Sequence, residues 1–109
     1  MKELVVCSVG DLLPGEVKIV RSGQLAVGVF NAGGEFYALE DRCSHDDGPL
    51  AEGEFEPEEC VVTCPRHGSR FDIRTGRPLT LPAYVPVDTF EVRTEDGLVK
   101  LVLPEDAVR

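Results

Sequence analysis

CSHDDGPL at residues 43–50 and TCPRHGSRFD at residues 63–72 are the two stretches that decide how this sequence is interpreted. The chain has only two histidines, and each follows closely on a cysteine. One residue separates Cys43 from His45, and two residues separate Cys64 from His67. One such pair is weak evidence, because cysteine is among the most commonly buried residues. Two pairs that use every histidine of the chain predict a single metal site built from two loops.

Two kinds of metal site use two cysteines and two histidines. Structural zinc is bound by such a set, but zinc fingers usually pair cysteine with cysteine and histidine with histidine. A [2Fe–2S] cluster in which two histidines replace two cysteines on one iron uses the same set. In that arrangement each loop offers its cysteine to one iron and its histidine to the other. The mixed pairs favour the iron–sulfur cluster, and a zinc-stabilised interaction module is the alternative from a different class.

The sequence around the two loops predicts short β-strands separated by turns. No segment of eleven or more residues repeats apolar residues at the helical period. Asn31 to Gly34 and Glu95 to Gly97 are typical hairpin turns, because glycine tolerates a positive φ. The expected strands are 3–9, 17–20, 25–30, 35–40, 60–63 and a pair within 88–103. The fold class is therefore expected to be all-β, with an antiparallel sandwich or open barrel.

The length of 109 residues indicates one small domain. Composition changes between about 41 and 83, where β-branched runs become rare and Gly, Pro and charged residues accumulate. An irregular segment of this length is usually functional, and both Cys/His pairs lie inside it. Asp46 and Asp47 in this segment are interpreted as part of a solvated turn rather than as an acid–base pair.

The net charge of −9 argues against a nucleic-acid partner, which would require a basic surface. Two interpretations of this charge stay open, namely solubility and an acidic face that steers a basic protein partner. The apolar stretch at the N-terminus is interrupted by Ser8 and Asp11, so neither a signal peptide nor a membrane span is expected. The expected location is the cytoplasm, where thiols stay reduced. Cys7 and Cys60 lie in apolar runs and are expected in the core.

The motif CSH…CPRHGSRFD resembles the Rieske iron–sulfur proteins, in particular the small soluble Rieske ferredoxins that serve ring-hydroxylating oxygenases. The stretches DLLPGE, LAVGVFNAGGEFYALEDRC and RFDIRTGRPLTLPA extend the resemblance over most of the chain. By this resemblance, one iron of a single [2Fe–2S] cluster is bound by the two cysteines and the other by the two histidines. The four implied ligands are Cys43, Cys64, His45 and His67.

The resemblance also implies an architecture and a function. One Rieske domain would span residues 1–109, with a β base from 1–40 and 84–109 and an inserted cluster-binding subdomain from 41–83. The protein would be an electron carrier rather than an enzyme, passing single electrons from a flavin-dependent reductase to a terminal oxygenase. The small subunit of an NADH nitrite reductase has a similar fold and is a second interpretation, although many such subunits lack the Cys/His quartet.

Several positions depart from the pattern of high-potential Rieske proteins. Those proteins carry a disulfide near the cluster, where this chain has Gly48 and Arg66. They also place a serine and a tyrosine near the sulfurs, and here Ser69 is kept while Phe71 replaces the tyrosine. A reduction potential in the low part of the Rieske range is therefore expected. Pro82-Ala83 resembles the proline loop that shields the cluster in the family.

Overall fold

β-Strands make up almost all of the regular structure. The computed structural model describes residues 2–23, 25–42, 49–66, 68–81 and 83–104, and the only helix within them is a 3-10 turn, η1 (Val9–Asp11). No helix in this part of the chain is long and apolar enough to cross a membrane. The all-β prediction is confirmed. The strands are β1 (Lys2–Ser8), β2 (Val17–Ser22), β3 (Leu25–Ala32), β4 (Glu35–Glu40), β5 (Phe55–Glu56), β6 (Val61–Thr63), β7 (Arg70–Asp72), β8 (Thr89–Glu95) and β9 (Leu98–Leu103).

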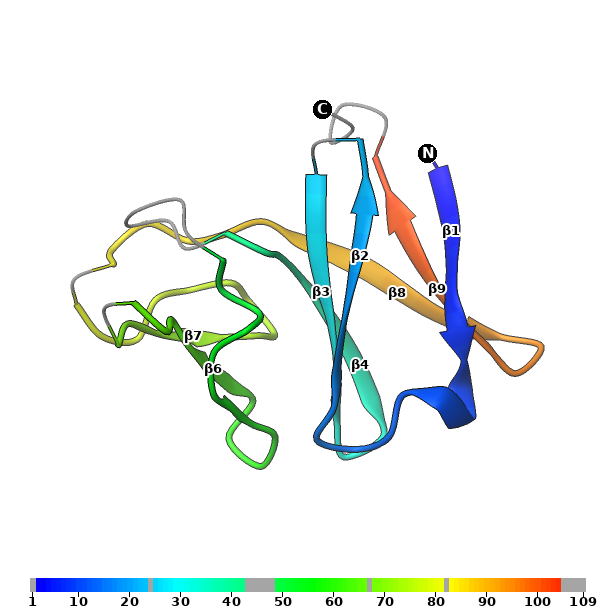
Figure 1. Ribbon diagram of the computed structural model, residues 1–109, viewed down its shortest axis with the longest axis horizontal. Helices are drawn as coiled ribbons and strands as arrows, with labels where there is room; N and C mark the ends of the chain where they lie inside the picture. The colour runs from blue at the N-terminus through cyan, green and yellow to red at the C-terminus, as the bar shows by residue number, and fades with distance from the viewer. Residues whose placement is uncertain (1, 24, 43–48, 67, 82, 105–109) are drawn as a thin grey trace.

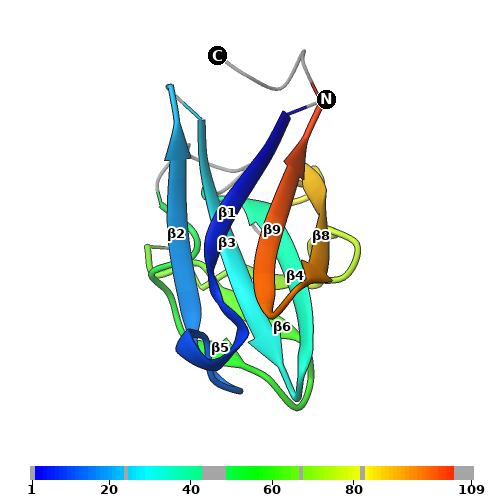
Figure 2. The same ribbon diagram turned by 90° about the vertical axis from the view of Figure 1, so that its right-hand side faces the viewer.

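The larger sheet has six antiparallel strands in the order β1-β9-β8-β4-β3-β2. Its two halves are joined where β4 pairs with β8 through only two residue pairs, so the sheet folds over on itself. The first and last strands of this order lie close together (Figure 2), and Lys2 Nζ donates a hydrogen bond to Ser22 Oγ across 3.3 Å. The sheet is therefore nearly closed, which agrees with the open barrel expected from the sequence.

Both predicted hairpins are present. The β3–β4 turn uses Gly33 and Gly34 at φ 66° and 99°, and the side chain of Asn31 accepts a hydrogen bond from the Gly34 amide at 2.7 Å. The β8–β9 turn uses Asp96 and Gly97 at φ 54° and 75°. Positive φ at both central positions gives the tight turns whose twist matches that of the strands they join.

Two apolar cores lie on opposite faces of β3 and β4. Val27, Val29 and Ala38 contribute to the core inside the folded sheet. Phe30 and Leu39 belong to the other core, which includes buried side chains from residues 50–87. Because both faces of β3 are covered, its apolar run is nearly continuous rather than alternating.

The second, smaller sheet has three strands in the order β5-β6-β7. The sequence predicted a strand from residue 60, but β6 begins at Val61, because Cys60 has a φ of 57° and ends the preceding turn. The short strands β5 and β7 were not predicted, since two or three residues are too few to show alternation. Cys60 and Cys7 are partly rather than fully buried, and each packs against the edge of a core.

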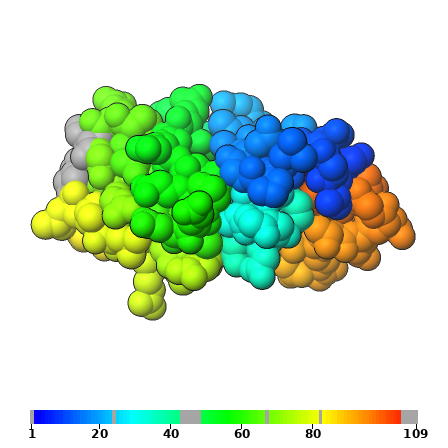
Figure 3. Space-filling model, turned by 90° about the horizontal axis from the view of Figure 1, so that it is seen from below, coloured from blue at the N-terminus to red at the C-terminus, as the bar shows by residue number. Residues whose placement is uncertain are grey.

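The smaller sheet and its loops lie at one end of the long axis, and β1, β8 and β9 reach the other end (Figures 1 and 3). The two ends are connected by the core that contains Phe30. The ring of Phe30 meets that of Phe55 edge to face at 5.0 Å between centroids. Gly28 lies directly over Ala51, where any added Cβ would come within 2.6 Å of the alanine Cβ.

Candidate metal centre

Of the four predicted ligands, Cys64 is the one that the structure describes. Cys43, His45 and His67 lie outside the described residues, as do Asp46, Asp47 and Gly48. Within the described residues no group of three His, Cys, Asp or Glu side chains gathers as a metal site. The environment of Cys64 and the described ends of the two loops therefore carry the structural argument.

Cys64 begins the turn that joins β6 to β7 (Figure 1). Its amide donates to the carbonyl of Ser69 at 2.7 Å, and its carbonyl accepts from the amide of Gly68 at 3.0 Å. Gly68 has a φ of 75°, a conformation that is costly for residues with a Cβ. The turn is thus closed by backbone hydrogen bonds at both of its ends, which fixes the backbone of Cys64.

The thiol of Cys64 is buried and forms no disulfide. The residue is 1% exposed and belongs to the core shared by the two sheets. A buried cysteine in an apolar core also occurs without any ligand, so burial alone does not identify a metal site. Its position at the start of the β6–β7 turn, beside a buried hydroxyl, is the more specific observation.

That hydroxyl belongs to Ser69, which is fully buried. Its Oγ accepts a hydrogen bond from the amide of Ala83 at 3.1 Å. No residue that the structure describes accepts the proton of the hydroxyl itself. A buried hydroxyl proton without an acceptor destabilises the protein, unless a bound ligand accepts it. The sulfur of a cysteine thiolate or of a bound sulfide, at a site that includes Cys64, would be such an acceptor.

The loop that contains the first predicted pair is held at its ends by Asp41. The Asp41 carboxylate accepts hydrogen bonds from the amides of Leu50 at 2.9 Å and Ala51 at 2.7 Å. The amide of Asp41 in turn donates to the carbonyl of Ala26 on β3 at 2.8 Å. The Asp41 carboxylate therefore joins the described ends of this segment, and the Asp41 amide ties them to the larger sheet. Sequence analysis did not identify Asp41. The only feature that could have indicated its role was its position just before a predicted ligand loop.

Gly53, which follows the first loop, packs closely against the end of β6. A Cβ at Gly53 would lie 1.7 Å from the carbonyl oxygen of Thr63, the residue before Cys64. The amide of Gly53 donates to the carbonyl of Leu50, and the amide of Thr63 to that of Glu54. The chain that leaves the first loop is thus packed directly against the strand that leads into the second.

A third segment, residues 78–85, borders the Cys64 turn. The amide of Leu79 donates to the carbonyl of Arg70 at 2.6 Å, and the amide of Arg70 donates to Thr80 Oγ1 at 2.9 Å. Ala83 is buried and reaches Ser69, as described above. The resemblance of Pro82-Ala83 to a shielding loop concerns this segment, although Pro82 itself lies outside the described residues.

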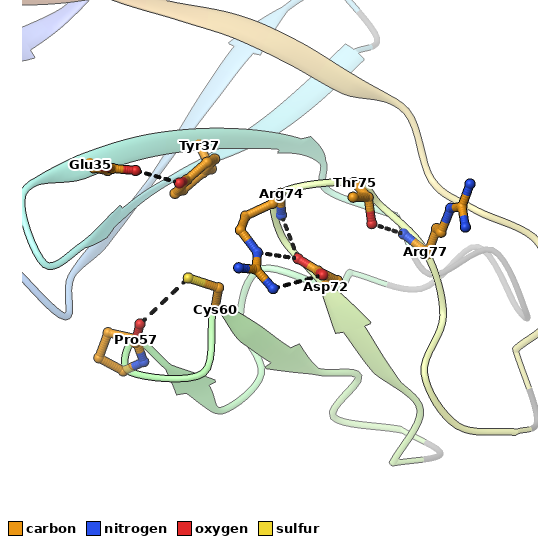
Figure 4. Close-up of polar contacts among 8 residues, drawn as sticks. All are labelled: Glu35, Tyr37, Pro57, Cys60, Asp72, Arg74, Thr75 and Arg77. Carbon is orange, nitrogen blue, oxygen red and sulfur yellow. Dashed lines mark hydrogen bonds and ion pairs between the residues drawn. The ribbon is translucent and has the colours of Figure 1, made fainter.

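The polar contacts drawn in Figure 4 join residues of β4, of the turn before β6, and of the end of β7 and the segment after it. The guanidinium of Arg74 bonds both carboxylate oxygens of Asp72 at 3.1 Å, and this lowers the pKa of the Asp72 carboxyl. Tyr37 donates to Glu35 at 2.6 Å, which raises the pKa of the tyrosine. The thiol of Cys60 points to the carbonyl of Pro57 at 3.7 Å. Each group is occupied by a neighbour in the chain.

The match to a protein-family model identifies the cofactor that this site would bind. Residues 2–91 match the model of the Rieske [2Fe–2S] domain. The chain belongs to the Rieske [2Fe–2S] domain family. The fold expected from the resemblance is thereby confirmed, and so is the expected cofactor, a single [2Fe–2S] cluster.

Relatives of this Rieske domain are ferredoxins of dioxygenase systems. The chain is 47% identical over 98 residues to the ferredoxin component of biphenyl 2,3-dioxygenase from Rhodococcus jostii (strain RHA1), covering 88% of this chain and 90% of the relative. It is 39% identical over 105 residues to the ferredoxin subunit of 3-phenylpropionate/cinnamic acid dioxygenase from Escherichia coli (strain K12), covering 96% and 97%. Among solved structures it matches a chain of the complex of reduced oxygenase and oxidized ferredoxin in carbazole 1,9a-dioxygenase, with a TM-score of 0.85, 38% identity and 91% of each chain covered.

The described residues fit a cluster of the Rieske kind. Cys64 supplies a buried sulfur at the start of a hydrogen-bonded turn, and Ser69 supplies a hydroxyl whose proton has no acceptor among the described residues. Phe71, where high-potential members carry tyrosine, is fully buried and offers no hydroxyl. The Rieske domain therefore has one side-chain donor of this pair instead of two.

Proposed function

We propose that this Rieske domain is the ferredoxin component of a ring-hydroxylating dioxygenase system. It accepts one electron from a flavin-dependent reductase and passes it to a terminal oxygenase. The observation that carries this proposal is that the chain matches ferredoxin components over nearly the full length of both partners in each comparison. A related chain has been solved in a complex of oxygenase and ferredoxin. The protein is thus an electron carrier, and the oxidation of the aromatic substrate takes place on the oxygenase.

We infer that Cys43 and Cys64 bind one iron and that His45 and His67 bind the other. The burial of Cys64 at the start of the β6–β7 turn supports its part in this assignment. The contact of Gly53 with Thr63 supports a common centre, because it packs the exit of the first loop against the entry to the second. We also propose a domain arrangement that the same packing supports. The base comprises 1–40 and 84–109, and the cluster-binding subdomain comprises 41–83.

The ligand set explains why the electron is accepted readily. The bound cluster takes up and releases one electron. Each imidazole brings no charge where a thiolate would bring −1, so the two histidines make the site less negative before the electron arrives. A less negative site accepts an electron more easily, which raises the potential above that of all-cysteine clusters. Ser69 adds a hydroxyl dipole that favours the more negative reduced state.

We also propose that the protein works in the cytoplasm. Cys7, Cys60 and Cys64 are free thiols in the described part of the chain, as expected in a reducing compartment. Fractionation of cells that express the protein, followed by immunodetection, should recover it with cytoplasmic markers. Recovery with periplasmic or membrane markers would contradict this location.

The ligand assignment is tested by metal analysis of anaerobically purified protein. The wild type should hold two irons and two acid-labile sulfides per chain and show the visible absorption of a Rieske cluster. Cys43→Ser, His45→Ala, Cys64→Ser and His67→Ala should each abolish normal assembly, because each removes a proposed ligand. Cys7→Ser and Cys60→Ser are the matched controls and should retain the cluster. Stoichiometric zinc in a colourless wild-type protein would favour the interaction module instead.

The electron-carrier role is tested by reconstitution. The cluster-loaded protein should be reduced by a flavin-dependent reductase with NADH and should then support single turnovers of its cognate terminal oxygenase. A protein that holds its cluster but exchanges no electrons with that oxygenase, while coupling to a nitrite reductase, would overturn the proposal.

A further inference from the structure

Exposed apolar side chains gather in one short segment of the chain. Seven large apolar residues are well exposed among those that the structure describes, and four of them lie between 79 and 85. Leu81 and Tyr84 are 78% and 79% exposed, the two highest values of the seven. Single exposed apolar residues are ordinary, but a contiguous group of them marks a contact surface. The four residues are Leu79, Leu81, Tyr84 and Val85.

This apolar segment, residues 79–85, borders the cluster site. The amide of Leu79 donates to the carbonyl of Arg70 at 2.6 Å, and the amide of Ala83 donates to Ser69 Oγ at 3.1 Å. Both acceptor residues follow Cys64 closely in the chain. It lies at the end of the long axis opposite β1, as the yellow region of Figure 3 shows. A partner that covers the segment therefore comes close to the residues that hold the cluster.

The apolar side chains are displayed on a backbone that is held in place. Ala83, in the middle of the segment, is 3% exposed and belongs to the shared core, so it anchors its exposed neighbours. A shallow hollow of about 270 Å³ lies among them. A preformed apolar surface binds with a small loss of conformational entropy. The hollow is lined by Pro78, Leu79, Thr80, Leu81, Ala83 and Tyr84.

The positive charge next to this segment comes mainly from Arg77. The sequence from 60 to 87 holds four arginines and one aspartate. Arg70 is paired with Glu56 and Glu59, and Arg74 with Asp72, so neither arginine adds free positive charge here. Arg77 is exposed, has no ion pair to a described residue, and points away from Asp72 in Figure 4.

We propose that the apolar segment 79–85, with Arg77 at its edge, is the docking surface for the terminal oxygenase, and that the oxygenase presents an apolar patch bordered by acidic side chains. The inference rests on the proposed function and names the surface through which it acts. A second copy of this chain does not suit the surface, because each copy carries a charge of −9 and the copies repel. The oxygenase suits it, because a related chain is known in a complex of oxygenase and ferredoxin. The acidic balance of the chain then serves solubility rather than docking.

The test compares variants of the cluster-loaded protein in binding to the cognate terminal oxygenase. Leu81→Ser and Tyr84→Ser should each raise the dissociation constant about tenfold, because each removes a large apolar side chain from the contact. Tyrosine is also among the residues that most often dominate such contacts. Arg77→Glu should weaken binding about as much at low salt and less at high salt, since salt screens charge but not apolar contact. Val5→Ser is the matched control, because Val5 is 60% exposed on β1 at the far end and should leave the constant unchanged.

Two further readouts separate docking from cluster integrity. The visible spectrum and the midpoint potential of every variant should match those of the wild type, since none of the altered side chains is a proposed ligand. Unchanged oxygenase binding in both Leu81→Ser and Tyr84→Ser would overturn the inference, as would weaker binding to the reductase alone. A wild-type dimer in sedimentation that Leu81→Ser dissociates would also overturn it. A wild type that holds its cluster and transfers no electrons to the oxygenase would instead overturn the proposed function.

Discussion

Ser69 shows how one buried hydroxyl can set a property of the bound cluster. Its Oγ already accepts from the amide of Ala83, so its proton is free to bond sulfur. Such a bond stabilises the reduced state more than the oxidised state, because the reduced site is more negative. If its net contribution is about 1 kcal/mol, removing it should lower a one-electron potential by about 40 mV.

The first prediction is therefore that Ser69→Ala lowers the midpoint potential by about 40 mV, measured by voltammetry or redox titration. Thr80→Ala is the matched control, because the Thr80 hydroxyl also accepts a hydrogen bond from a backbone amide, that of Arg70, but is exposed. Phe71→Tyr, which restores the family's second donor, should raise the potential by a similar amount if the ring keeps its place. An unchanged potential in Ser69→Ala would show that another group controls the cluster.

The second prediction concerns Asp41, whose carboxylate accepts hydrogen bonds from the amides of two buried residues, Leu50 and Ala51. Asp41→Ala leaves both amides without their acceptor and should lower the free energy of unfolding by about 2–3 kcal/mol. It should also speed the loss of visible absorption on storage, because the first ligand loop is no longer closed. Chemical denaturation measures the first effect and spectroscopy the second.

Asp41→Asn is the informative companion, since it keeps one oxygen that can accept both amides. It should recover most of the lost stability, whereas Asp11→Ala, at an exposed acidic position in η1, should change little. Equal stability of Asp41→Ala and the wild type would show that the two hydrogen bonds contribute nothing.

Cys64 and Asp41 show what a sequence reveals about single residues. Cys64 was predicted as a ligand from its short spacing to His67, a pattern that needs no knowledge of the fold. Asp41 was not identified, because its role depends on the chain returning after the loop to place two amides against one carboxylate. In the sequence, an aspartate followed by Arg42 has the pattern of ordinary surface charge.

At the scale of elements, Gly53 packs directly against β6, a contact that joins the chain after the first ligand loop to the strand before the second. The backbone conformation of Gly53 does not require glycine, because its φ is not positive. Its surroundings do require glycine, because a Cβ there would collide with the carbonyl oxygen of Thr63. A third prediction is that Gly53→Ala destabilises the protein by about 1–3 kcal/mol, the usual cost of overpacking. Thermal unfolding should show a midpoint lower by several degrees.

Gly10→Ala is the control for this prediction, since a Cβ at Gly10 would meet nothing within 4 Å. It should leave the midpoint within a degree or two. If both variants behaved alike, the approach of Gly53 to Thr63 would have no energetic consequence.

The elements were predicted well where periodicity or turn chemistry marked them. The strand at 35–40 and the two hairpins were predicted correctly because glycine turns bound alternating runs. β5 and β7 were missed because tertiary contacts, rather than local pattern, make them strands. β7 exists because Val61–Thr63 lies opposite it in register, and no local signal indicates such a partner.

At the scale of the molecule, the core shared by base and cluster site makes the two mutually dependent. Phe30 and Leu39 of the larger sheet pack in one cluster with Cys64, Phe71 and Ile73. A fourth prediction is that loss of the cluster, followed by visible absorption, and loss of strands, followed by far-ultraviolet circular dichroism, coincide in one thermal transition. Leu39→Ala should move both curves down together. Strands that persist well above the temperature of bleaching would show two independent units.

This shared core also bears on the rate of electron exchange. Each transfer requires bonds and surroundings to adjust between the oxidised and reduced geometries, and the energy of that reorganisation forms much of the activation barrier. A close-packed interior has low compressibility and resists such adjustment, and at 1% exposed Cys64 has almost no contact with water that would have to reorient. On the Cys64 side of the site, little of the driving force would therefore be spent on rearranging protein and water.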